Sequence, residues 1–318
     1  MDAMSTTTDQ GTHPIQQLIQ VLDEIIVGQS RATELMLIGL LSGGHVLIED
    51  VPGVGKTTLA TALAKVLSLD FRRVQCTPDL LPSDILGSNI LDPRDGSLTF
   101  HKGPIFTQVL LVDETNRASP RTQSGLLEAM NEKQVTVDGV TRPLLDPFYV
   151  IATQNPVDHQ GTYALPVAQL DRFLVRVDMG YPGEADELKV LFDRQLGDPL
   201  EHIQVLATDT DVRSWQTAVK EVTVSHDVGQ YLLQLIRRTR SHPDVALGIS
   251  TRGALGLFRA SQARAFIHGR SFCTPKDVQM LAAPVLAHRL TLTPRAKQSG
   301  RSDVGIVEEL LAQQPVPV

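Results

Sequence analysis

The sequence predicts an α/β fold followed by an all-helical region, and three observations lead to this prediction. An apolar run at 46–49 leads into a glycine-rich turn and then into a helical stretch. A second apolar run at 108–112 is followed by two acids and has the continuous hydrophobicity of a buried parallel strand. Every segment from Thr208 onward shows helical spacing. With 318 residues, the chain is long enough for two domains.

The composition is that of an ordinary globular chain, with 42% hydrophobic and 20% charged residues. No segment approaches the apolar length of a membrane span, and the polar start from Met1 to Gly11 lacks the basic and apolar parts of an export signal. Cys76 and Cys273 lie far apart without a partner at metal-ligand spacing, so they suit a reducing compartment. We therefore expect a cytoplasmic protein without a membrane span.

The charge balance argues against nucleic acid as an obligate partner. The net charge is −7, whereas binding of nucleic-acid phosphates needs a clustered basic face. The run Arg237-Arg238-Thr239-Arg240 resembles such a cluster, but on a helix its three arginines spread around the circumference. We expect this run to be a solvated face.

Two helices are expected before the first strand, because apolar residues recur at helical spacing across residues 14–42. The bend that joins them is Ile26-Val27-Gly28-Gln29. In many nucleotide-binding folds the segment at this position lies beside the adenine. Its position in the chain therefore suggests a place near a nucleotide base.

The first strand leads into the turn that organises the rest of the chain, Asp50-Val51-Pro52-Gly53-Val54-Gly55-Lys56-Thr57-Thr58. Backbone N–H groups of such a loop face one concavity at a helix N-terminus, where the helix dipole favours an anion such as a nucleotide phosphate. In this pattern Lys56 reaches the β- and γ-phosphates, and the hydroxyl of Thr57 ligates magnesium. The predicted nucleotide-binding residues are Gly53, Val54, Gly55, Lys56, Thr57 and Thr58, with Thr58 as a helper.

Asp50 is a departure from this pattern, which has a glycine six residues before its lysine. Aspartate tolerates unusual backbone angles better than most residues, and the glycines nearest the phosphates are present. A strand before the loop and a helical run after it supply the expected setting. The alternative interpretation is a glycine turn beside an unrelated lysine.

The second apolar run closes in Asp113 and Glu114. In a phosphate-loop enzyme the first acid holds magnesium, usually through water, and the second polarises the attacking water. We therefore predict Thr57 and Asp113 as metal ligands and Glu114 as the general base. Alternatively, the two acids only cap the strand and begin the next turn.

Further elements follow from turn and strand signals. Asp-Gly turns predict two hairpins, at 91–100 and 134–144. Other expected elements are a strand at 71–76, a helical start at 81–85, a helix capped by Ser119 and Pro120, strands at 148–153 and 174–177, and a short helix around 187–194.

Three further polar side chains occupy candidate positions. Asn155 follows a strand and can hold the attacking water, although Asn before Pro is also common turn chemistry. Arg172 stands where a helix meets the last strand, either as a surface ion-pair member or as a finger that reaches a phosphate. Arg252 stands in the first turn of a helix that opens at Ser250.

The predicted divisions of the chain follow these elements. They are a flexible N-terminus at 1–14, an α/β nucleotide-binding domain at 15–180, a linker at 181–206, a helical domain at 207–295 and a tail at 296–318 with one weak helix at 307–311. The helical domain carries apolar stripes at Val228 to Ile236 and at Val278 to Leu286, the second behind the cap Thr274-Pro275. We expect these stripes to be packing faces.

With these motifs in order, residues 15 to 295 resemble the MoxR family of AAA+ ATPases. The resemblance rests on the segments Gly44 to Thr57, Val112 to Ala118, Gln154-Asn155-Pro156 with Gly161-Thr162-Tyr163, and Leu165 to Phe173. It implies a AAA+ P-loop core with a five-stranded parallel sheet and a C-terminal helical lid. It assigns Lys56 and Thr57 to Walker A, Asp113 and Glu114 to Walker B, Asn155 to sensor 1, Arg172 to the arginine finger and Arg252 to sensor 2.

The resemblance also implies an activity and an assembly. The expected assembly is a hexameric ring that hydrolyses ATP with Mg2+. Hydrolysis would remodel or mature a protein client. In relatives a protein with a von Willebrand A domain often acts beside the ring. The hairpin at Asp95 resembles the insert that marks this AAA+ subgroup. Where the family usually has a glutamate, this chain has Val167, which puts a polar contact at the subunit interface in doubt. In this subgroup the lid is displaced, so Arg252 serves either its own nucleotide or that of a neighbour.

Two other hypotheses remain open. A nucleic-acid motor of the same subgroup would need basic hairpin tips, and only Arg94, Lys102 and Arg142 lie near them. A nucleotide-gated scaffold would bind ATP but scarcely hydrolyse it, and the intact Asp113 and Glu114 argue against it. The sequence does not identify the client.

Overall fold

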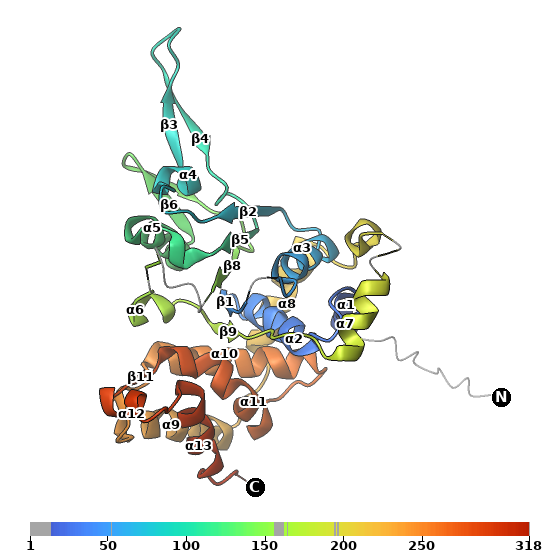
Figure 1. Ribbon diagram of the computed structural model, residues 1–318, viewed down its shortest axis with the longest axis vertical. Coiled ribbons are helices and arrows are strands. Elements are labelled where there is room, and N and C mark those ends of the chain that lie inside the picture. Colours follow the sequence, from blue (N-terminus) through green and yellow to red (C-terminus); the bar gives the residue numbers. More distant parts are fainter. Residues whose placement is uncertain are drawn as a thin grey trace, which may run out of the picture.

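The computed structural model describes residues 14–51, 53–155, 162–163, 165–193, 195 and 197–317 (Figure 1). All but the last residue of the predicted flexible N-terminus at 1–14 therefore lie outside the described residues, as do Pro156 and Gly161 of the family motifs. The described part forms an α/β domain and a mostly helical domain, which lies below the sheet in Figure 1. No helix among these residues has the length and apolar character needed to cross a membrane.

The α/β domain is built on a five-stranded parallel sheet with the order β2-β5-β8-β1-β9, which confirms the predicted sheet. Its strands are β1 Val46–Glu49, β2 Phe71–Gln75, β5 Val109–Asp113, β8 Tyr149–Gln154 and β9 Val175–Val177. β5 is buried at every position because both faces of the sheet are covered, which explains its continuous apolar sequence. The carboxyl ends of β1, β5 and β8 meet at one edge of the sheet.

Helices cover both faces of this sheet. Alternate strand residues such as Val46 and Leu111 pack with α1, α2 and α3, whereas Leu47 and Leu110 pack with α4 and α5. The helices of this domain are α1 Pro14–Ile25, α2 Ser30–Leu41, α3 Lys56–Val66, α4 Pro82–Leu86, η1 Thr115–Arg117, α5 Pro120–Glu132, α6 Val167–Leu170 and α7 Glu184–Asp193. The predicted cap of α5 is present, since Ser119 Oγ accepts a hydrogen bond of 3.3 Å from Thr122 N.

Two hairpins leave the domain where the Asp-Gly turns predict them. β3 Gly87–Leu91 pairs with β4 Leu98–Lys102, and β6 Gln134–Val137 pairs with β7 Val140–Pro143. The β3–β4 hairpin projects far from the sheet (Figure 1). The hairpins also contact each other, because the guanidinium of Arg142 on β7 lies 3.7 Å from the centroid of the Phe100 ring on β4.

The C-terminal domain is mostly helical but contains one pair of strands that the sequence analysis missed. β10 Val245–Leu247 and β11 Thr291–Leu292 pair antiparallel, and both are too short to show a period of two. The helices are α8 Asp209–Glu221, α9 His226–Ser241, α10 Thr251–Ile267, α11 Pro275–Leu286, α12 Pro294–Gln298 and α13 Asp303–Ala312, with short η3 Pro199–His202 before them and η4 Ala287–Arg289 after α11.

The weak helix expected at 307–311 is longer and better packed than its sequence suggests. It forms α13, which packs against α9 and α11 and buries Ile306, Val307 and Leu310. Part of the segment expected to be a tail at 296–318 thus contributes to the core of the helical domain. The other predicted divisions stay predictions.

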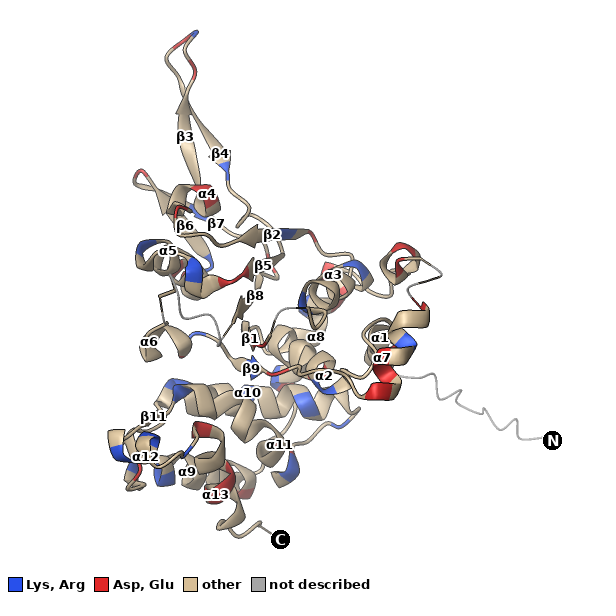
Figure 2. Ribbon diagram, viewed as in Figure 1, with Lys and Arg blue, Asp and Glu red and all other residues tan. Residues whose placement is uncertain are grey.

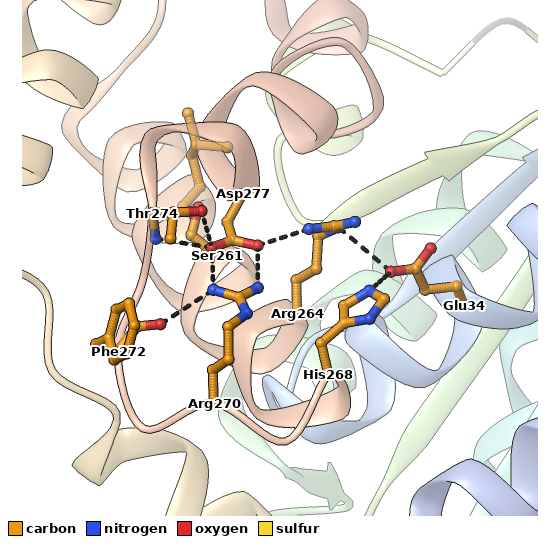
Figure 3. Close-up of polar contacts among 9 residues, drawn as sticks. Glu34, Ser261, Arg264, His268, Arg270, Phe272, Thr274 and Asp277 are labelled. Atoms are coloured by element: carbon orange, nitrogen blue, oxygen red, sulfur yellow. Dashed lines mark hydrogen bonds and ion pairs between the residues drawn. The ribbon is translucent and has the colours of Figure 1, made fainter. Parts of the chain in front are cut away.

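The two domains share one hydrophobic core. They also share an ionic contact, which Figure 3 shows. Glu34 on α2 lies 3.3 Å from Arg264 Nε on α10 and 2.9 Å from Nε2 of His268, the residue directly after α10. Arg264 and Arg270 in turn pair with the fully buried carboxylate of Asp277 at 2.6 Å each. This network connects the sheet domain to the interior of the helical domain.

Candidate functional site

The phosphate loop is shaped for an anion. Gly53 and Gly55 both have a φ of +90°, a left-handed conformation that glycine adopts without strain. Gly55 precedes the first residue of α3, and no side chain caps the N-terminus of that helix. The first N–H groups of α3 are therefore available to an anionic ligand, as the sequence predicts.

A cavity of about 370 Å3 opens over this loop, and we call it the phosphate cavity. It brings together side chains from the loop, from β2 and from the carboxyl ends of β5 and β8, because these strand ends meet at one edge. Its lining residues are Gly53, Gly55, Lys56, Thr57, Thr58, Arg73, Gln75, Asp113, Glu114, Thr153 and Asn155. All predicted catalytic and binding residues lie here except Val54, Arg172 and Arg252.

Lys56 is oriented by the main chain of the loop. Its Nζ donates a hydrogen bond of 2.9 Å to the carbonyl oxygen of Asp50. Burial lowers the pKa of Lys56, and the negative charges of Asp50, Asp113 and Glu114 oppose that decrease. The ammonium group thus stands among carboxylates, where an anionic ligand would give it a stronger partner.

The two predicted acids are held by Thr153 on the neighbouring strand β8. Thr153 Oγ1 donates a hydrogen bond of 2.8 Å to Asp113 Oδ1 and accepts one of 3.0 Å from Glu114 N. Glu114 has a left-handed φ of +54°, and its carboxylate lies 2.9 Å from Arg117 Nε. The second oxygen of Asp113 lies 2.7 Å from Arg73 Nη2 and 2.8 Å from Arg73 Nε on β2.

Arg73 and Thr153 are site residues that sequence reasoning missed. Each lies within a predicted strand but outside the motif residues themselves. Their positions become informative only with the strand order, because β2 and β8 flank β5 on either side. The signal that could have identified them is a polar residue near the end of a strand that neighbours the strand ending in Asp113.

The donor set fits nucleotide and magnesium. Mg2+ is usually held by one or two protein oxygens together with phosphate oxygens and water. Thr57 and Asp113 supply such oxygens at the phosphate cavity, and the described residues contain no group of three or more His, Cys, Asp or Glu side chains that would form a protein cage. A magnesium ion bound there would neutralise phosphate charge.

A second cavity of about 480 Å3 adjoins the first, and we call it the base cavity. Both cavities share Gly53, Gly55 and Thr58. The base cavity has a largely apolar lining from the bend after α1, from Val54 and from the segment around α7, including Ile25, Ile26, Val27, Tyr181, Pro182, Val190 and Leu191. An apolar hollow next to a phosphate site fits a planar base. Contact of the 26–29 bend with adenine stays a prediction.

Arg172 and Arg252 line neither of these cavities. They line a third one of about 300 Å3, which also includes Lys133, Arg259 and Arg289. We call it the basic cavity. It contains Gly44 and His45 at the amino end of β1, whereas the phosphate loop follows the carboxyl end of that strand. The two predicted arginines are therefore separated from Lys56 within one chain.

The two arginines differ in their contacts. Arg252 donates a hydrogen bond to Asn131 Oδ1 on α5. Arg172 has no ion-pair partner within the part of the chain that the structure describes, although the neighbouring Asp171 pairs with Arg289 at 2.8 Å. Val167 begins the short helix α6, five residues before Arg172.

Comparisons with known proteins agree with the fold. The model of the ATPase family associated with various cellular activities matches residues 45–175, and the model of the AAA lid domain matches residues 237–310. The class of protein is thus a AAA+ ATPase, with the helical domain as its lid.

Relatives identify the family within that class. The chain is 45% identical to YeaC of Bacillus subtilis over 96% of each chain. It is 38% identical to Chaperone MoxR1 of Mycobacterium tuberculosis over 96% of this chain and 83% of that protein. The crystal structure of a candidate ATPase from Cytophaga hutchinsonii matches with a TM-score of 0.89 and 37% identity, over 96% of this chain and 95% of that one. The chain belongs to the MoxR family of AAA+ ATPases.

Proposed function

We propose that this protein hydrolyses ATP in a cytoplasmic, ring-shaped homo-oligomer and uses the energy to remodel a protein client. The observation that carries the proposal is the phosphate cavity, which gathers the phosphate loop, two acids and Asn155 in one hollow. A nucleotide-gated scaffold would not need Glu114 beside the loop. The chaperone name of the Mycobacterium tuberculosis relative supports a protein client.

The side chains divide the reaction among them. Lys56 would bind the β- and γ-phosphates, and Thr57 and Asp113 would hold the magnesium ion. Glu114 would accept a proton from the attacking water, which Asn155 would help to orient. The ion pair with Arg117 holds the carboxylate of Glu114 in one position at the phosphate cavity, which supports a positioned base.

We propose that Arg172 and Arg252 act on the nucleotide of a neighbouring subunit. Both arginines line the basic cavity, at the end of β1 opposite the phosphate loop. In a ring, expected to be hexameric, the phosphate cavity of one subunit would face the basic cavity of the next. Four cationic side chains of the basic cavity would suit the phosphates, because the fifth, Arg289, is buried against Asp171. The exposed position of Arg252 supports action in trans.

The hairpins favour a protein client over nucleic acid. Near the tip of β3–β4 the apolar side chains Leu91 and Leu98 are 59% and 67% exposed. The turn between them carries Asp92, Arg94 and Asp95, so that acids outnumber bases there (Figure 2). Apolar side chains suit a protein surface, whereas a nucleic-acid motor needs a basic one.

Glu114→Gln tests hydrolysis. This variant should bind ATP like the wild type, because it keeps the phosphate ligands, while phosphate release should fall about a hundredfold or more. Lys56→Ala is the matched control, since it should lose ATP binding itself. Titration with a fluorescent nucleotide and a phosphate-release assay measure the two steps. Near-normal hydrolysis by Glu114→Gln would show that the two acids only end a strand.

Mixing two inactive variants tests action in trans. Arg172→Ala should lose roughly a thousandfold in hydrolysis, as for arginine fingers in related phosphoryl transfers. A mixture with Lys56→Ala should regain activity, because some interfaces then pair an intact phosphate loop with an intact Arg172. No recovery beyond the sum of the two variants would contradict the proposal, provided that light scattering shows mixed assembly. Failure to assemble would instead point to an interface weakened at Val167.

A further inference from the structure

Asp50 occupies the position at which the phosphate-loop pattern has a glycine, and its carboxylate accepts hydrogen bonds there. The residue is only 8% exposed. Its Oδ1 accepts a hydrogen bond of 2.7 Å from Val51 N, within the loop. Its Oδ2 accepts hydrogen bonds of 2.8 Å from Met179 N and 2.6 Å from Gly180 N, far along the chain. One carboxylate thus binds three backbone N–H groups.

The segment that Asp50 holds belongs to the wall of the base cavity. Met179 and Gly180 follow β9 and lead directly into Tyr181 and Pro182, which line that cavity. The opposite wall is attached to the same segment, because Gln29 Nε2 donates a hydrogen bond of 3.2 Å to the carbonyl oxygen of Gly180. Both walls therefore depend on the position of residues 179–180.

Asp50 also contacts the phosphate side of the site. Its carbonyl oxygen accepts the hydrogen bond from Lys56 Nζ, and Asp50 N donates one of 3.2 Å to the carbonyl oxygen of Gln154 at the end of β8. A glycine at this position would keep these main-chain contacts but would lose all three carboxylate hydrogen bonds. The N–H of the buried Met179 would then lack its partner, which is costly.

We propose that Asp50 is a positioning residue that fixes the wall of the base cavity to the phosphate loop, so that the base and the phosphates of one nucleotide are bound as a unit. This inference rests on the proposed nucleotide binding. Asp50 thereby increases the affinity for the nucleoside part of the ligand, whereas the neighbouring loop residues bind the phosphates.

Comparison of ATP with inorganic tripolyphosphate tests the inference. Tripolyphosphate carries the phosphates without the nucleoside, so the ratio of the affinities for ATP and tripolyphosphate reports how strongly the nucleoside part is bound. In Asp50→Gly the affinity for ATP should fall roughly tenfold, the equivalent of losing one good hydrogen bond to a charged group. The affinity for tripolyphosphate should stay within about twofold or become tighter, because a nearby negative charge is removed. Calorimetric titration of the full chain with each ligand and Mg2+ gives both values, with Glu114→Gln present in every protein so that ATP is bound but not hydrolysed.

Asp50→Asn is the matched control for charge. It removes the charge but keeps an oxygen that can accept hydrogen bonds from Met179 N and Gly180 N. It should therefore retain most of the ATP preference, by which we mean the ratio of the affinity for ATP to that for tripolyphosphate. Equal losses of ATP preference in the Asn and Gly variants would overturn the inference. So would a parallel fall in the affinities of Asp50→Gly for both ligands, which would show that Asp50 only shapes the phosphate loop.

Gln29→Ala provides a second, independent variant in case Asp50→Gly does not fold. It removes the other attachment of Gly180 while leaving the phosphate loop intact, so the affinity for ATP should again fall more than that for tripolyphosphate. Wild-type preference in Gln29→Ala would contradict the inference. If the wild-type protein binds neither ligand, the proposed function itself fails, which is a separate result.

Discussion

Asp113 and Asp277 are both buried acidic side chains paired with arginine, yet their arginine partners differ in number and in exposure to solvent. Asp277 in the lid is 0% exposed and accepts hydrogen bonds from Arg264, Arg270 and Thr274 (Figure 3). Asp113 at the end of β5 pairs with a single arginine, Arg73, whose side chain is 49% exposed at the phosphate cavity. We call Asp277 with its arginines the closed pair and Asp113 with Arg73 the open pair. No ligand can reach Asp277, whereas Asp113 can exchange Arg73 for a ligand that enters the phosphate cavity.

The difference separates a stabilising cluster from a binding site. Removing one partner of a buried ion pair leaves an uncompensated charge and typically costs about 3–5 kcal/mol, whereas an exposed pair contributes about 1 kcal/mol or less. Asp277 also joins the start of α11 to the end of α10, so it orders the turn between them. Asp113 is itself only 7% exposed and is positioned by Thr153, but its arginine partner reaches solvent.

The largest expected effect is on stability in the lid. Asp277→Ala should lower the free energy of unfolding by about 3–5 kcal/mol, because Arg264 and Arg270 lose their shared acceptor. Urea unfolding measures this change. Asp113→Ala, the same substitution at the other pair, should cost less than Asp277→Ala, because Arg73 is half-exposed and stays hydrated when its partner is removed. Similar losses in both variants would show that the two pairs do not differ as described.

Sequence reasoning identified the residues whose role is set by local motif. Lys56, Thr57 and Asp113 were predicted because strand, turn and helix follow one another directly in the chain, and the structure places them in one cavity. The five strands and both hairpins were predicted for the same reason. Local periodicity is thus sufficient wherever contacts are made between near neighbours in sequence.

Contacts between distant segments were not predictable in this way. Arg73 reaches Asp113 across the sheet, which requires the strand order. From the sequence, Asp50 is only a departure from the phosphate-loop pattern. The backbone N–H groups that its carboxylate binds belong to Met179 and Gly180, which lie 129 and 130 residues later. The cap of α11 was predicted, but the two arginines that make Asp277 a buried ionic centre were not.

The pH dependence of stability should distinguish the closed pair from the rest of the chain. Burial raises the pKa of Asp277, but hydrogen bonds from Arg270, Thr274 and Arg264 outweigh it and bring the pKa to about 2, below the ordinary value of 3.8. The ionised carboxylate therefore stabilises the fold above pH 4, and this contribution is lost as the pH falls through 2. It amounts to about 2 kcal/mol.

Comparison with Asp277→Asn isolates that contribution, because all other acids titrate in both proteins. The difference in free energy of unfolding between wild type and variant should shrink by about 2 kcal/mol between pH 5 and pH 2, with roughly half of the change complete by pH 3. Urea unfolding at each pH measures it. A constant difference would show that Asp277 keeps its ordinary pKa in the folded protein.

The smallest expected effect concerns the open pair and the metal. Arg73 binds one oxygen of Asp113, the residue that would hold magnesium, so the arginine and the metal should compete for this carboxylate. Arg73→Ala should raise the apparent affinity for Mg2+ by about two- to fivefold, because a half-exposed ion pair contributes about 1 kcal/mol or less. Titration of Mg2+ at a fixed concentration of a fluorescent ATP analogue that cannot be hydrolysed measures this affinity without turnover. Arg72→Ala, on the same strand but outside the lining of the phosphate cavity, is the matched control and should leave it unchanged. A weaker Mg2+ affinity in Arg73→Ala would contradict the competition, because it would mean that Arg73 supports the loaded site instead of holding Asp113 in the absence of metal.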